Sequence, residues 1–125
     1  DNLQYPTSLA PLVPGYLPVL PRDPSGTVAC TTGNEASCYY YNGYRSGGGG
    51  CTASNPAVLY QLGAKLEDPS SQALIDDIDF DFSVSYGICT GGNPNGGFLG
   101  NSIACTSLAG TPQPSGTEQC YSQKP

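Results

Sequence analysis

Histidine, methionine and tryptophan are all absent from this chain of 125 residues. Without histidine, the chain cannot build a Ser-His-Asp or Cys-His catalytic centre, or hold zinc, copper or haem through an imidazole. Basic residues are scarce as well, because four Lys and Arg face ten Asp and Glu and leave a net charge of -6. Nucleic-acid binding depends on clustered Lys and Arg, so this balance excludes a nucleic-acid partner.

The sequence also lacks a signal peptide and any run of about 18 apolar residues. We therefore expect a mature or trimmed chain that does not span a membrane by itself. Its length is typical of one domain, so we expect a single globular domain over residues 1–125. Within it, residues 1–26 form a Pro-rich lead-in and residues 27–125 form a β region stapled by disulfides.

Six cysteines are present, none of them in a C-x-x-C pair, and their spacing is too wide for a zinc knuckle: Cys30, Cys38, Cys51, Cys89, Cys105 and Cys120. The even number and the low charge favour an oxidising compartment and three disulfides, with six buried thiols as the alternative. Three cysteines precede residue 57 and three follow residue 67, so complete pairing requires at least one bridge between the two halves. Each bridge would contribute about 2–4 kcal/mol to the free energy of unfolding.

Alternating apolar and polar residues predict two antiparallel strands, at 57–66 and 79–88. The apolar face of the first would carry Val58, Tyr60 and Leu62, and that of the second Phe80, Phe82 and Val84. Three consecutive tyrosines at 39–41 predict a further strand, ended by a hairpin turn at Asn42-Gly43. Gly47 to Gly50 should be irregular, and residues 118–122 should form an edge strand.

Helical structure is expected only in short pieces, at 72–77 and between Thr7 and Val13, where Ser8 would be the N-cap. The predicted fold class is therefore α+β, mainly β. A helix of seven or eight residues cannot cover a sheet of three or four strands, although a sheet with one apolar face needs a second layer. The sequence thus predicts a sheet whose cover is incomplete.

The Pro-rich opening carries a resemblance to a known family. The run Tyr5-Pro6, Leu12-Val13-Pro14, Tyr16-Leu17-Pro18, Leu20-Pro21 and Asp23-Pro24-Ser25-Gly26 resembles bacterial type IV pilins and type II secretion major pseudopilins. Residues 39–41 and 58–69 are similar to the first strands of that family and the acidic turn after them. The family's long, apolar N-terminal helix is missing from this chain. The resemblance implies that the helix was removed from the same precursor or is supplied by a separate small chain.

From the resemblance we expect a structural protein without catalytic activity, a homo-oligomer that forms the outer shell of a pilus or pseudopilus-like extracellular filament. It would cross the periplasm during assembly and act at the cell surface. The residues that would dock on the missing helix are Leu9, Leu12, Leu17, Val58, Tyr60, Leu62, Phe80, Phe82 and Val84. The alternative from the residues alone is a free-standing secreted adhesin or carbohydrate-binding module, with the tyrosines of 39–44 as a stacking surface.

An acidic segment offers one further site. Six of the ten acids lie between Glu67 and Asp81, and oxygen-rich clusters suit calcium. The candidate ligands are Asp76, Asp77, Asp79 and Asp81, and major pseudopilins hold calcium in their β region. The competing interpretation is a solvated acidic strand face, because Asp79 and Asp81 alternate with phenylalanines. No other cofactor is expected, and no catalytic pair of carboxylates stands out.

Overall fold

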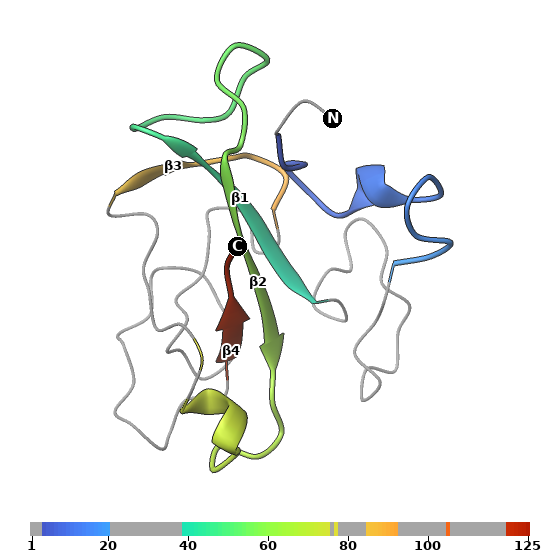
Figure 1. Ribbon diagram of the computed structural model, residues 1–125, viewed down its shortest axis with the longest axis vertical. Coiled ribbons are helices and arrows are strands. Elements are labelled where there is room, and N and C mark those ends of the chain that lie inside the picture. Colours follow the sequence, from blue (N-terminus) through green and yellow to red (C-terminus); the bar gives the residue numbers. More distant parts are fainter. Residues whose placement is uncertain (1–3, 21–38, 76, 78–84, 93–104, 106–119) are drawn as a thin grey trace.

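The computed structural model describes residues 4–20, 39–75, 77, 85–92, 105 and 120–125. Its centre is a four-stranded antiparallel sheet in the order β3-β1-β2-β4, formed by Tyr40–Ser46 (β1), Leu59–Lys65 (β2), Tyr86–Ile88 (β3) and Cys120–Gln123 (β4) (Figure 1). Two short 3-10 turns accompany it, Ala10–Leu12 (η1) and Gln72–Leu74 (η3). Among the described residues no helix reaches seven residues, and none is long and apolar enough to cross a membrane. The described structure is therefore mainly β.

Two predicted elements have the expected places. Alternation predicted a strand at 57–66, and β2 occupies Leu59–Lys65 of that range. The edge strand expected at 118–122 is confirmed as β4, which lies at the edge of the sheet beside β2 among the described strands. The strand expected at 79–88 is described only from residue 85 onward, where β3 begins at Tyr86. Phe80, Phe82 and Val84 lie outside the described residues.

The predicted hairpin turn at Asn42-Gly43 is wrong, because β1 runs through both residues to Ser46. Asn42 lies opposite Gln61 of β2, and the carbonyl of Gly43 accepts a hydrogen bond from the Cys89 amide at 2.9 Å. The glycine is needed for close packing instead. A Cβ at position 43 would lie 3.1 Å from both the Ala57 Cβ and the Pro6 carbonyl oxygen. The chain leaves β1 at Gly47–Gly50, where Gly47 and Gly49 have positive φ angles.

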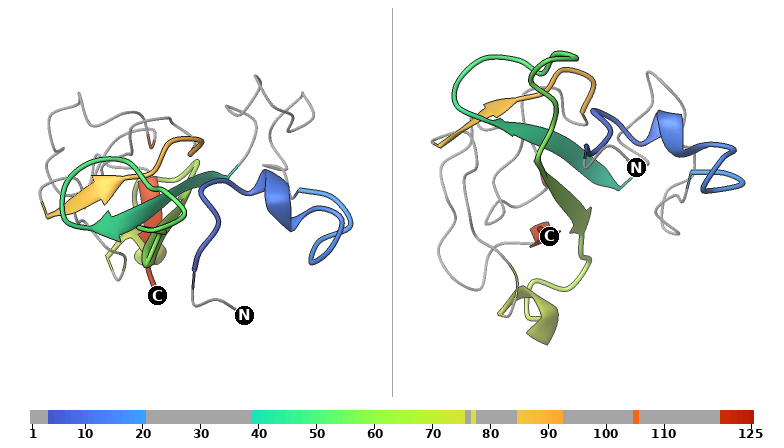
Figure 2. Two further views of the ribbon diagram at one scale, coloured as in Figure 1. Left: turned by 90° about the horizontal axis from the view of Figure 1, so that it is seen from above. Right: turned by 45° about the horizontal axis from the view of Figure 1, so that its top comes forward.

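The N-terminal helical turn is shorter than predicted. It is a single 3-10 turn over Ala10–Leu12, its N-cap is Leu9 rather than Ser8, and no side chain caps it. Pro11 lies within the first turn, where its missing N–H costs little. From this turn the lead-in continues to one side of the sheet in all three views (Figures 1 and 2).

The buried residues of β2 and β4 lie on the face opposite Val58, Tyr60 and Leu62, which are the residues that the sequence predicts for the apolar face. In β2 the buried positions are Gln61 and Gly63, and in β4 they are Cys120 and Ser122. Leu62 and Gln123 on the other face of the same strands are exposed. Alternation locates the two faces of a strand, but it does not determine which of them the rest of the chain covers.

Candidate docking face

The less covered side of the sheet is defined by strand register. Tyr41 of β1 lies opposite Leu62 of β2, and Ala64 of β2 lies opposite Tyr121 of β4, so these side chains project from one face. Val58 and Tyr60 belong to the same face by alternation. We call this surface the open face: Tyr41, Val58, Tyr60, Leu62, Ala64 and Tyr121. Val58 is 43% exposed and Leu62 is 38% exposed, and the two lie on the same face of the sheet.

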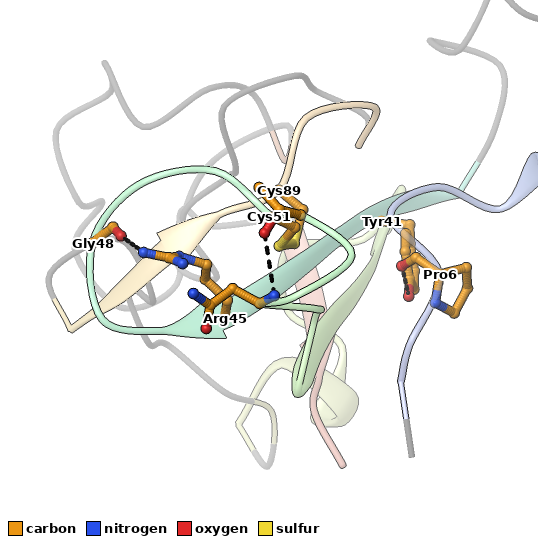
Figure 3. Close-up of a disulfide and its surroundings, with 8 residues drawn as sticks. Pro6, Tyr41, Arg45, Gly48, Cys51 and Cys89 are labelled. Carbon is orange, nitrogen blue, oxygen red and sulfur yellow. Dashed lines mark hydrogen bonds between the residues drawn. A yellow bond between two sulfur atoms is a disulfide. The ribbon is translucent and has the colours of Figure 1, made fainter. Parts of the chain in front are cut away.

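The lead-in is attached to this face at one place. The Tyr5 amide donates a hydrogen bond to the Ala57 carbonyl at 3.0 Å. The Tyr41 hydroxyl donates one to the Pro6 carbonyl at 2.8 Å (Figure 3). Tyr5 also packs edge-on against Tyr60, with ring centroids 4.9 Å apart, and Tyr60 stacks on Tyr41 at 6.0 Å. Burial raises the pKa of the Tyr41 hydroxyl above its ordinary value of 10.0, and any negative charge on the two neighbouring tyrosines would raise it further.

Beyond this attachment the described part of the lead-in is exposed or partly exposed. None of its described residues from 7 to 20 is buried, and Tyr16 is 80% exposed. Three of the predicted docking residues lie here, and all are partly exposed: Leu9, Leu12 and Leu17. The segment is also without charge, because no Lys, Arg, Asp or Glu occurs between Asp1 and Arg22. It therefore presents an uncharged, largely apolar surface on a strongly acidic molecule.

A disulfide-held loop lies over β3. Cys51 bonds to Cys89, 38 residues away, and Arg45 donates a hydrogen bond to the Gly48 carbonyl (Figure 3). The loop crosses directly over β3, because a Cβ on Gly87 would come within 2.6 Å of the Gly47 carbonyl oxygen. This bridge joins the two halves of the chain, as the parity of the cysteines predicts.

A second disulfide lies on the covered face. Cys105 bonds to Cys120 of β4, both are fully buried, and Tyr40 packs against them. No described cysteine is free, whereas Cys30 and Cys38 lie outside the described residues. The two observed disulfides indicate an oxidising compartment outside the cytoplasm.

The acidic segment is described only in part. Asp77 accepts a hydrogen bond from the Ser122 amide at 2.8 Å, which ties the turn after η3 to β4. Asp76, Asp79 and Asp81 lie outside the described residues. Within the described part of the chain, no three His, Cys, Asp or Glu side chains form a group that could hold a metal ion. The calcium site therefore stays a prediction.

The structure brings together some of the predicted docking residues and adds others. Val58, Tyr60 and Leu62 share the open face, whereas Leu9, Leu12 and Leu17 lie along the lead-in. Sequence analysis did not identify Tyr5 and Tyr41 as the residues that join these two regions. In the sequence, Tyr5 precedes Pro6 and Tyr41 precedes Asn42. Such neighbours are too common to predict a contact between residues 35 positions apart.

The chain matches no protein-family model, no curated protein and no solved structure. What its structure defines is a small domain with a four-stranded antiparallel sheet and two disulfides.

Proposed function

We propose that this chain is the outer globular subunit of a type IV pilus-like or pseudopilus-like extracellular filament. A long apolar helix, from the same precursor or from a separate small chain, covers its open face. The observation that carries the proposal is that Val58 and Leu62 are exposed on a sheet whose opposite, more polar face is buried. The resemblance of the Pro-rich lead-in to pilins supports the same function.

The energetics favour such a cover. Burying a Val or Leu side chain completely is worth about 1.5–3 kcal/mol, so completing the burial of Val58 and Leu62 would contribute about 1 kcal/mol each. Three partly exposed leucines of the lead-in could add to this: Leu9, Leu12 and Leu17. A partner that contacts both the open face and the lead-in could therefore gain several kcal/mol of binding free energy.

Charge favours the same surface. None of the six described residues that define the open face is acidic, although the whole chain carries a net charge of -6. Copies of an acidic subunit repel one another, so an apolar helix that occupies an acid-free face is an effective means of holding many copies together. The observed disulfides stabilise the domain in the compartment where filaments are assembled.

The proposal is tested by adding a synthetic apolar helix of about 20 residues, with one acid near its start, to the purified chain in mild detergent. NMR shift changes should map to the open face and the lead-in. Leu62→Asp should weaken binding at least tenfold, because it places a charge in the apolar contact. Ile75→Asp is the matched control, since Ile75 is 72% exposed beside η3 and away from the open face. Absence of binding, or equal effects of the two variants, would contradict the proposal.

A free-standing carbohydrate-binding module is the second candidate. It is favoured by the partly exposed aromatic rings of Tyr60 and Tyr121 on the open face, since sugars stack on such rings. In that case oligosaccharides, and not the helix, should shift the same NMR signals. Tyr121→Ala should then abolish the effect, whereas it would alter helix binding only modestly.

A further inference from the structure

Two polar side chains face each other inside the sheet. Asn42 of β1 lies directly opposite Gln61 of β2, and both residues are fully buried. The Tyr44 hydroxyl donates a hydrogen bond to the Gln61 Oε1 at 2.9 Å. The Gln61 Nε2 and both polar atoms of the Asn42 side chain have no hydrogen-bond partner in the protein. Three unsatisfied polar atoms thus lie within one cross-strand pair.

The protein encloses this pair of side chains. Asn42 and Gln61 both have a relative exposure of 0%, so solvent does not reach either side chain from the surface. The backbone closes over the group as well: a Cβ on Gly92 would lie 2.6 Å from the Asn42 Cγ and 2.7 Å from the Tyr41 carbonyl oxygen. Glycine at position 92 is what allows the chain to pass there. A solvent-exposed ligand therefore cannot reach the pair.

Burying these three polar atoms without hydrogen-bond partners would destabilise the folded state. Each buried polar atom without a partner lowers the folding equilibrium constant by roughly 5- to 100-fold. Buried polar groups in proteins are satisfied by protein atoms or by internal water, which typically makes about three hydrogen bonds. The chemistry of this pair, with an amide oxygen and amide nitrogens on adjacent strands, suits water, since water both donates and accepts.

We propose that Asn42 and Gln61 form a binding site for internal water, with at least one molecule bridging the two side chains. This water accepts a hydrogen bond from the Gln61 Nε2 and donates one to the Asn42 Oδ1. It links β1 to β2 beside their backbone pairing, and it favours this register, since a shift of one strand by one residue would place the two amides on different faces of the sheet. The site is independent of the helix proposed for the open face.

The test is NMR of the oxidised, full-length chain. Long-lived water should give cross-relaxation signals at the Asn42 side-chain amide. In Gln61→Leu, which keeps the Asn42 amide, these signals should be lost. A double-mutant cycle of Asn42→Leu and Gln61→Leu should show a coupling of at least about fivefold in the unfolding equilibrium constant, because both residues share the water. Gln123→Leu, at an exposed polar position, is the control and should couple with neither.

Three results would overturn the proposal. The first is the absence of a long-lived water signal in the wild-type chain, which can be read even if the variants fail to fold. The second is an increase in stability for each leucine variant with additive effects, as expected of a dry pair relieved of polar atoms. The third is a direct hydrogen bond between the two amides with no water signal beside it.

Discussion

Replacing Gly87 by alanine should destabilise the protein strongly for a single methyl group. The added Cβ would meet two backbone carbonyl oxygens, of Gly47 and Gly49, and would lie 3.1 Å from the Arg45 Cγ. Backbone atoms cannot rotate away as side chains do, and the loop is held in place by the Cys51–Cys89 disulfide. Overpacking of this kind costs about 1–3 kcal/mol, and the double backbone contact leads us to expect about 2 kcal/mol.

The assay is urea unfolding of the oxidised protein. With a slope of about 2 kcal/mol per molar urea, the midpoint of Gly87→Ala should fall by roughly 1 M. Gly50→Ala is the matched control in the same loop, because a Cβ at position 50 has nothing within 4 Å. Its free energy of unfolding should change by no more than about 0.5 kcal/mol. If both variants unfold at the wild-type midpoint, the glycine loop does not cross β3, and the described packing is wrong.

Three further perturbations follow from single contacts. Tyr41→Phe removes the hydrogen bond that holds the lead-in, so it should lower the free energy of unfolding by about 1 kcal/mol in urea. Tyr121→Phe is the control and should leave the free energy of unfolding almost unchanged, because the Tyr121 hydroxyl accepts a hydrogen bond only from the exposed Gln123 side chain. Because burial raises the Tyr41 pKa, the stability that the neutral Tyr41 hydroxyl contributes is complete below about pH 10 and is lost as the pH rises further. The free energy of unfolding of the wild-type protein should therefore fall more steeply above about pH 10 than that of Tyr41→Phe. Ser70→Ala should raise the pKa of the Asp68 carboxyl in an NMR titration, since the Ser70 hydroxyl is the main group that lowers it and only the backbone amide bond would remain. Replacing both cysteines of the Cys51–Cys89 bridge by alanine should lower the free energy of unfolding by about 4 kcal/mol, on the basis of its separation of 38 residues, and an unchanged midpoint would refute that estimate.

Much of the sheet could be predicted because its signals are local. Period-two alternation identified β2, and the parity of the cysteines required a bridge such as Cys51–Cys89. A short turn after the acidic loop was also expected, and it is the 3-10 turn η3. Each of these depends on spacing along the chain, which the sequence contains directly.

Other features depend on tertiary contacts and could not be predicted. Asn42-Gly43 has a strong hairpin propensity, but pairing with β2 on one side and with the β3 segment on the other keeps the chain extended. The side of the sheet that becomes buried was likewise undetermined, and the polar pair of Asn42 and Gln61 lies on it. In both cases a local preference yields to a contact between residues far apart in sequence.

The most direct test of the docking face is photo-crosslinking in the native assembly. A photoreactive amino acid would replace Leu62, on the open face, and in a separate variant Ile75, and the crosslinked peptides would be sequenced by mass spectrometry. Our account predicts that position 62 forms crosslinks to a long apolar helix and that position 75 does not. Crosslinks from position 62 to no partner, or only to the globular part of another copy, would contradict it.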